Sequence, residues 1–213
     1  LPEGIEFITQ EQIDNFQVNY PGCTEIEGDV YISGDDIINL QGLDVLTTIG
    51  GNLEIFWNGS LTSLTGLEGV TSIGGGLQID FNNALTSLSG LEGVNSIGGS
   101  LEIGGWGGIG GNFALTSLTG LENIDPGSIE YLGIYCNDNL SLCNVESICN
   151  YLAAPNATID IWGNAPGCNS INEVTESCGY PTPIDLYLTS QAQIDSFQIN
   201  YPGITEIWMN LMI

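Results

Sequence analysis

The sequence predicts a mainly β fold, a parallel β-solenoid of leucine-rich-repeat-like coils of about 24 residues with a short capping helix. Three observations predict it. One stretch of the chain recurs at a fixed interval, apolar residues alternate within each copy, and a Gly-Gly pair precedes each alternating stretch. A repeat interval of roughly 20–29 residues is typical of leucine-rich and β-helical solenoids.

The repeat is read by comparing the chain with itself. Residues 43–55 (LDVLTTIGGNLEI) recur as residues 67–79 and again as residues 91–103, each time after 24 residues. A fourth copy starts at Leu121 after six extra residues, and looser copies continue to Cys178. Each copy is therefore expected to form one coil.

Within a coil, apolar residues at every second position predict a short strand with an inward apolar side. Leu53, Ile55 and Trp57 form one such triplet, and Leu77, Ile79 and Phe81 form the next. The Gly-Gly pair before each strand is expected to supply the positive φ of a tight corner. The residue just after each strand is an asparagine, which is expected to hydrogen-bond from coil to coil, with a metal or ligand role as the alternative: Asn58, Asn82, Asn112, Asn137 and Asn164.

A longer repeat divides the chain. Residues 10–26 return as residues 191–207, with 13 of 17 positions identical at an offset of 181. Thr9 with Gln12, and Ser190 with Gln193, have the capping-box pattern that begins a helix. The expected organisation is an N-terminal capping strand and helix (1–22), a β-solenoid (23–179), a linker (180–183) and the start of a second copy of the module (184–213). That last segment is expected to belong either to a longer tandem array or to a contact with another subunit.

The repeat LTSLxGLExVxSIGGxLxI, the opening IDNFQVNYPGCTEIEGDVYI and the closing NLSLCNVESICNYL…GCNS resemble receptor-L-domain-like, leucine-rich modules. The resemblance covers about residues 5–178. It implies a right-handed solenoid of short parallel strands, in an exported protein of the bacterial cell surface or medium, with an adhesive or structural role. It implies no catalytic residues.

Charge excludes several classes of function. The 213 residues include 26 Asp and Glu but no Lys, Arg or His, which gives a formal net charge of −26. Nucleic acid and anionic membranes are therefore not expected as partners. Ser-His and Cys-His nucleophiles cannot form, so no enzyme is expected, and a two-carboxylate glycosidase is the remote alternative.

The positions of the cysteines within the repeats predict which of them form disulfides. Cys143 and Cys168 follow Asn137 and Asn164 at similar distances, and so do Cys149 and Cys178. Equivalent positions on adjacent coils lie about 5 Å apart, within disulfide reach. The expected bonds are Cys143–Cys168 and Cys149–Cys178, and the alternative is four reduced thiols in a cytosolic protein. Disulfides favour a secreted or cell-surface protein.

Cys23 and Cys136 are expected to be buried thiols. Cys23 is replaced by Ile204 in the second copy of the cap, so its place takes an apolar group. Cys136 occupies the strand position held by Trp57 and Phe81 in earlier coils. The two ends of the module separate these cysteines too far for them to pair.

Candidate ligand residues lie on the outward side of the strands. Aromatic rings beside carboxylates suit sugar rings, cations or another subunit, whereas a plain solvated face is the alternative; the residues are Phe56, Tyr135, Trp162, Glu54 and Glu102, with Trp106 on the glycine-rich insertion. Asp29, Asp35 and Asp36 are the candidate metal ligands, with Ca²⁺ as the cation and diffuse screening as the alternative. No organic cofactor is expected.

The function expected from these features is an extracellular structural or adhesive module that assembles with itself, as a head-to-tail filament or a tandem array. A carbohydrate-binding surface module is the competing interpretation.

Overall fold

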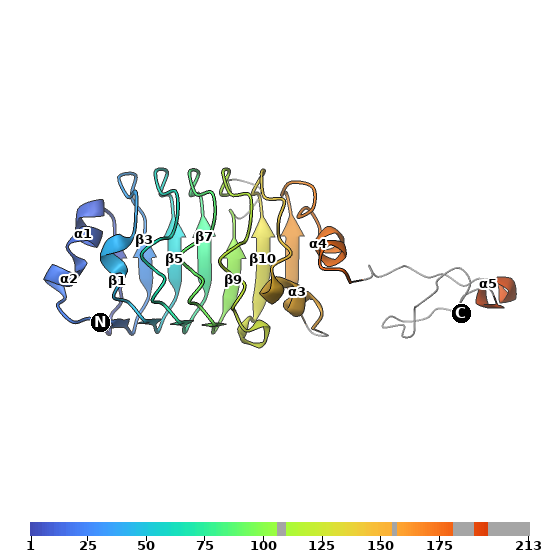
Figure 1. The fold of residues 1–213 in the computed structure, drawn as a ribbon, viewed down its shortest axis with the longest axis horizontal. Helices are drawn as coiled ribbons and strands as arrows, with labels where there is room; N and C mark the ends of the chain where they lie inside the picture. Colours follow the sequence, from blue (N-terminus) through green and yellow to red (C-terminus); the bar gives the residue numbers. More distant parts are fainter. Residues whose placement is uncertain (106–109, 155–156, 181–189, 196–213) are drawn as a thin grey trace. The chain divides into compact units, whose positions relative to one another are not determined.

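The computed structural model describes residues 1–105, 110–154, 157–180 and 190–195. The chain divides into two compact parts, Leu1–Tyr180 and Pro181–Ile213. The first part is an α/β fold in which one parallel sheet has seven strands and a second has four (Figure 1). Among the described residues, no helix has the length and apolar character needed to cross a membrane.

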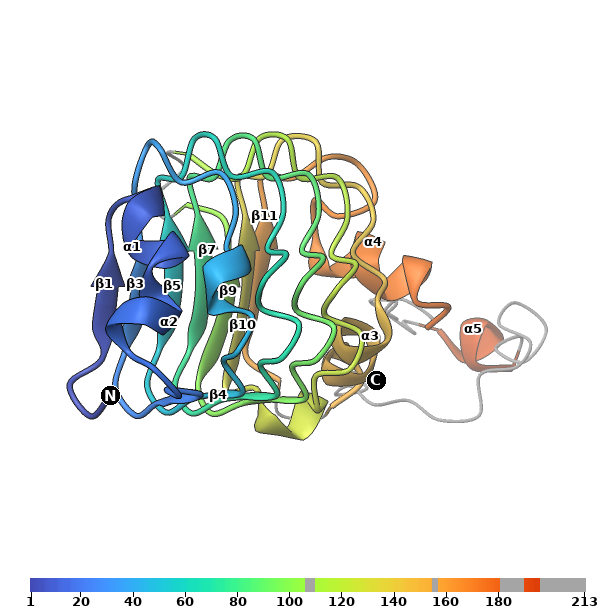
Figure 2. The same ribbon diagram turned by 60° about the vertical axis from the view of Figure 1, so that its left-hand side comes forward.

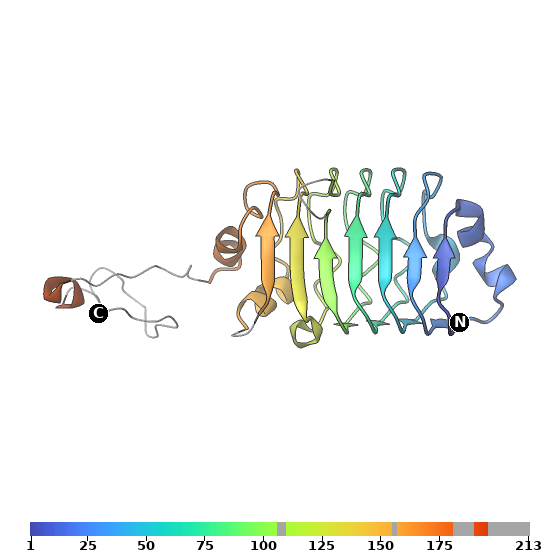
Figure 3. The same cartoon turned by 180° about the vertical axis from the view of Figure 1, so that it is seen from behind.

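The larger sheet contains one strand from each repeat, and these strands lie side by side in the order in which they occur along the chain (Figure 3). The strands of the smaller sheet alternate with the first five of them in the sequence. Its strands are β1 (Ile5–Phe7), β3 (Val30–Ile32), β5 (Leu53–Phe56), β7 (Leu77–Asp80), β9 (Ser100–Ile103), β10 (Tyr131–Tyr135) and β11 (Ile159–Trp162). The smaller sheet consists of two-residue strands, namely β2 (Glu25–Ile26), β4 (Thr48–Ile49), β6 (Ser72–Ile73) and β8 (Ser96–Ile97).

The 24-residue interval sets the register of both sheets. Leu53 pairs with Leu77, which pairs with Leu101, and Ile55, Ile79 and Ile103 pair in the same way. The side chains of these residues are fully buried. Burying an aliphatic side chain is worth roughly 1.5–3 kcal/mol, so the columns of identical residues stabilise the stack at every step.

The expectation of a mainly β fold, a right-handed parallel β-solenoid, is wrong, because the structure is an α/β fold with two parallel sheets and not a closed solenoid. Between β5 and β6 the apolar residues fall at every third position rather than every second, at Leu61, Leu64, Leu67 and Val70. There the Leu67 N–H donates to the Leu64 carbonyl and the Val70 N–H to the Leu67 carbonyl. This side of each repeat is therefore a chain of turns, and Figure 2 shows it opposite the strands of the larger sheet.

Helices complete the first part, which makes the fold α/β. At the N-terminal end, α1 (Gln10–Asp14) and α2 (Phe16–Asn19) bury Ile13 and Phe16, and the capping box expected at Thr9 and Gln12 is present. The later repeats carry α3 (Glu146–Leu152) and α4 (Ile171–Ser177), which the sequence analysis did not predict. Short 3-10 turns lie at Gln41–Leu43 and Pro126–Ser128. The second part contains α5 (Gln191–Asp195).

The expected asparagine ladder is present and buried. The Asn82 side-chain oxygen accepts from the Asn58 backbone N–H at 3.1 Å and from its side-chain amide at 2.9 Å. Asn112 and Asn137 accept in the same way from the preceding asparagine, and Asn164 accepts from Asn137. Each side-chain amide also donates to strand carbonyls, as Asn82 does to Ile55 and Asp80.

The structural reason for the Gly-Gly pairs differs from the expected one, which was a positive φ angle. Their φ angles are not positive. Instead, a Cβ atom at Gly74 would collide with the carbonyl oxygen of Gly50, and one at Gly98 with that of Gly74. Glycine is therefore required because successive backbones approach closely at this corner, not because the corner needs a left-handed residue.

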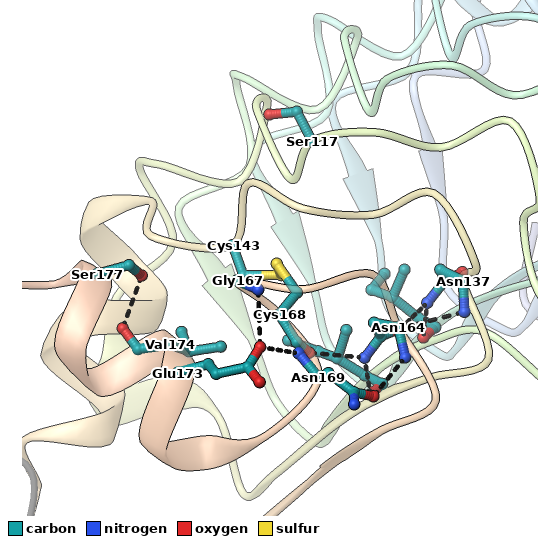
Figure 4. Close-up of a disulfide and its surroundings, with 12 residues drawn as sticks. Ser117, Asn137, Cys143, Asn164, Gly167, Cys168, Asn169, Glu173, Val174 and Ser177 are labelled. Carbon is teal, nitrogen blue, oxygen red and sulfur yellow. Dashed lines mark hydrogen bonds between the residues drawn. A yellow bond between two sulfur atoms is a disulfide. The ribbon is translucent and has the colours of Figure 1, made fainter.

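Two disulfides close the C-terminal end of the first part. They join Cys143 to Cys168, with Cα atoms 5.8 Å apart, and Cys149 to Cys178, at 5.5 Å. These are the pairs that the coil register predicts. Figure 4 shows the first of them beside the end of the asparagine ladder, where the Asn169 side chain accepts from the Asn164 N–H at 3.1 Å.

The ladder gives a test of what holds the repeats together. We expect Asn82→Ala to destabilise the protein by about 3 kcal/mol or more, because it leaves the Asn58 donors and the Ile55 and Asp80 carbonyls without their buried partner. Urea unfolding measures the change. Asn95→Ala is the matched control, since Asn95 is exposed and should change stability by less than about 0.5 kcal/mol. Equal losses in the two variants would contradict a structural role for the ladder.

Candidate functional site

The candidate site is the outer face of the larger sheet, the side of its strands that points away from the core (Figure 3). Two rows of side chains cross this face from strand to strand. The first row runs through Tyr31, Glu54, Gln78, Glu102, Gly133 and Asp160. The second row pairs Phe56 with Asp80 and, further along, Tyr135 with Trp162, and Gly104 directly follows β9 between these pairs.

Asp80 is the unusual residue of this face. Its side chain is only 5% exposed. One carboxylate oxygen, Oδ2, accepts from the Gln78 side-chain amide, whereas Oδ1 is buried and has no hydrogen-bond partner among the described residues. A buried polar atom without a partner costs free energy, and such atoms often mark a place where something else binds.

Burial, together with the charges of Glu102 and Glu54, raises the pKa of Asp80 to about 6, and the Gln78 hydrogen bond and the nearby Gly104 N–H oppose this rise. Burial also raises the pKa of Glu54, with Asp29 and Glu102 contributing. Carboxylates on neighbouring strands therefore repel one another across this face. A cation bound at this face would reduce the repulsion between these carboxylates.

Tyr135 lies flat on the sheet. A Cβ atom at Gly133 would collide with the Tyr135 phenol ring, so the missing side chain at Gly133 makes room for that ring. The Tyr135 hydroxyl donates to Glu102 Oε2 at 3.0 Å and lies 3.5 Å from the Tyr131 hydroxyl. Burial, followed by the hydrogen bond with Tyr131 and the charge of Glu102, raises the pKa of Tyr135.

Trp162 is the solvent-exposed ring beside Tyr135. The two ring centres are 5.6 Å apart with planes tilted by 35°. Trp162 is 36% exposed, whereas Tyr135 is 2% exposed. Of the aromatic residues predicted for this face, Trp162 therefore reaches solvent and Phe56 is half-buried. Tyr135 is buried and packs against Trp162. Trp106 lies outside the described residues.

The predicted inward direction of Trp57 and Phe81 is wrong. Each strand ends one residue earlier, and Trp57, Phe81 and Cys136 follow with φ between 55° and 58°. This left-handed conformation turns Trp57 outward, to 60% exposure, with its ring 5.7 Å from Phe56 and 5.8 Å from Phe81. Bulky residues rarely adopt this conformation. The sequence contained one indication of this conformation. Gly163 occupies the equivalent position after β11, with φ 69°, and glycine is common where φ is positive.

Two of the three proposed calcium ligands, Asp29 and Asp36, accept hydrogen bonds. Asp29 accepts from the Asn52 N–H at 2.7 Å and from the Tyr31 hydroxyl at 3.3 Å, and Asp36 accepts from the Gln10 N–H at 3.2 Å. Asp35 is exposed. Across the described ranges, no three His, Cys, Asp or Glu side chains gather closely enough to hold a metal ion, so Asp29, Asp35 and Asp36 are not brought together.

The burial of Asp80 predicts an inverted pH dependence. The folded pKa of about 6 lies above the ordinary value of 3.8, so the folded state binds this proton more tightly. The stability that this group contributes is present below about pH 4 and is lost as pH rises through 6. We expect Asp80→Asn to be more stable than the parent by on the order of 3 kcal/mol at pH 8 and by little at pH 4.

Urea unfolding at the two pH values measures this difference. Asp160→Asn is the control, because Asp160 is exposed on the same face and its substitution removes the same charge. A gain for Asp80→Asn that is equal at pH 4 and pH 8 would show that the carboxylate of Asp80 is not the source.

No family model, no curated protein and no solved structure matches this chain. The likeness of its repeats to leucine-rich modules therefore stays a prediction from the sequence, and its function is argued from its own residues.

Proposed function

We propose that this chain is an extracellular structural or adhesive module that associates head to tail with further copies of itself, in a filament or in a tandem array. The proposal includes no catalytic activity. The observation that carries it is the second copy of the N-terminal cap, at residues 184–213.

The two caps share a local structure as well as a sequence. Helix α5 (Gln191–Asp195) lies 181 residues after α1 (Gln10–Asp14), with the same length. In each helix the first side chain donates to the last at 2.8 Å, from Gln10 to Asp14 and from Gln191 to Asp195. The second segment therefore has the local preferences of a cap.

A capping segment stabilises a stack of repeats by covering the apolar residues at its end. In the first copy, Ile13 and Phe16 are fully buried over the first repeats. The residues at the same places in the second copy are Ile194 and Phe197. Apolar residues at these positions would bury their surface by covering the repeats of another module, either in the same chain or in a neighbour.

The sheet and the disulfides agree with this use. The strands β1 and β11 form the two edges of the larger sheet, and the edge of a sheet can pair with a strand from another copy. Two disulfides are compatible with an extracellular protein. An array outside the cell also suits a chain without Lys or Arg, because trypsin-like proteases cleave after those residues.

Self-association is tested with paired substitutions in the second cap. We expect Ile194→Asp to abolish assembly, seen as a shift to monomer by light scattering and as loss of filaments or arrays in electron micrographs. Burying an unpaired carboxylate in an apolar contact costs several kcal/mol, which corresponds to at least a hundredfold weaker association. Ala192→Asp is the control for added charge, since Ala192 is exposed on the same helix. A parent chain that stays monomeric at high concentration would contradict assembly between chains.

Carbohydrate binding is a second candidate, favoured by the exposed Trp162 ring beside Tyr135, whose hydroxyl donates to Glu102, and by the exposed Asp160 on the same strand as Trp162. An aromatic face bordered by carboxylate acceptors suits a sugar ring with its hydroxyl groups.

A glycan array tests this candidate with two tryptophan variants. We expect Trp162→Ala to weaken binding by about tenfold, corresponding to roughly 1.4 kcal/mol, and Trp57→Ala, which removes another exposed ring, to leave it unchanged. Equal losses in both variants would argue against a site at Trp162.

A further inference from the structure

We propose that the Asp80 carboxylate holds a small monovalent cation, Na⁺ or K⁺, on the outer face of the larger sheet between β7 and β9. The proposal is independent of self-association, since it concerns a site inside one module.

The geometry of Asp80 leaves one oxygen available. Gln78 occupies Oδ2 through its side-chain amide. Oδ1 is buried without a hydrogen-bond partner in the described part of the chain, on a side chain that is 5% exposed. Native proteins rarely leave such an atom unsatisfied. A ligand that accepts a lone pair, namely a cation, would satisfy it.

No side chain of this sequence supplies a cation. The sequence contains no Lys, Arg or His, and the amine of Leu1 donates to the carbonyl of Glu25, the first residue of β2. A buried carboxylate normally has an ion-pair partner. Here that partner has to come from solution.

The groups around Asp80 add negative charge or neutral oxygen. Glu54 on β5 and Glu102 on β9 are the carboxylates that face it, and both raise its pKa. On β10, the Tyr135 hydroxyl donates to Glu102. Phe56, directly opposite Asp80 on β5, presents an aromatic ring, a group that attracts cations through its π-electrons.

Size and charge select the ion. A divalent cation such as Ca²⁺ takes six to eight oxygen ligands and usually several carboxylates, and the described residues bring no three acidic groups together. The burial of Asp80 also excludes a bulky organic cation. One buried carboxylate, with the charges of Glu54 and Glu102 nearby but no close set of three acidic ligands, fits a singly charged alkali-metal ion.

The test compares cations at equal ionic strength in urea unfolding at pH 8. Urea is used because guanidinium is itself a cation. A bound ion stabilises the folded state by RT ln(1 + [L]/Kd), so at ten times Kd the unfolding equilibrium constant falls about elevenfold. We expect NaCl or KCl to give this saturable gain and tetramethylammonium chloride, whose cation is too large for a buried site, to give only the smaller effect of screening.

Two variants and one change of pH separate the site from the surrounding charge. Asp80→Asn should lose the difference between the alkali-metal salts and tetramethylammonium, and Asp160→Asn should keep it. At pH 5 the difference should shrink in the parent protein, because a proton then occupies Asp80.

Three results would overturn the proposal. In the first, all three salts stabilise the parent equally, which is diffuse screening. In the second, the selectivity persists in Asp80→Asn. In the third, millimolar CaCl₂ gives a gain that NaCl and KCl at the same ionic strength do not give, which assigns the site to a divalent ion.

Discussion

The asparagine ladder is the interaction on which the rest of the first part depends. Each side-chain oxygen accepts from the preceding asparagine, and each side-chain amide donates to strand carbonyls. A slip of one residue would place every strand's apolar side chains on the outer face and break all of these bonds together. The ladder therefore fixes the register that brings the leucine and isoleucine columns into the core.

The protein stabilises its carboxylates without cations by giving them backbone donors. Glu68, Glu92 and Glu122 accept from the N–H groups of Gly66, Gly90 and Gly120 at 2.7–2.8 Å, once in each of three repeats. At the C-terminal end, Glu173 accepts from Gly167 and Asn169. Hydrogen bonds to an ionised acceptor are stronger than neutral ones. These four carboxylates thus stabilise turns, whereas Asp80 keeps one buried oxygen without such a donor among the described residues.

Part of this structure followed from the sequence alone. A repeat of fixed length determines which residues are neighbours, so the strand register, the asparagine ladder and the partners of Cys143 and Cys149 could be derived without coordinates. The fold class could not, because the three-residue spacing of Leu61, Leu64 and Leu67 indicates a buried side but does not distinguish turns from a strand. Trp57 was misplaced because alternation cannot show where a strand ends. The burial of Asp80 depends on packing across the sheet, which a pattern along one strand does not contain.

The spacing of the ladder has a consequence for how this protein can change. Asn58 and Asn82 are 24 residues apart, but Asn82 and Asn112 are 30 apart, and the backbone-to-side-chain bond is 3.1 Å in one case and 3.0 Å in the other. The asparagine ladder therefore fixes where successive repeats meet but does not fix the number of residues between its asparagines. Mutation can lengthen, shorten or replace the segment after a strand while the scaffold stays intact. Repeats of unequal length can therefore share one continuous row of buried hydrogen bonds.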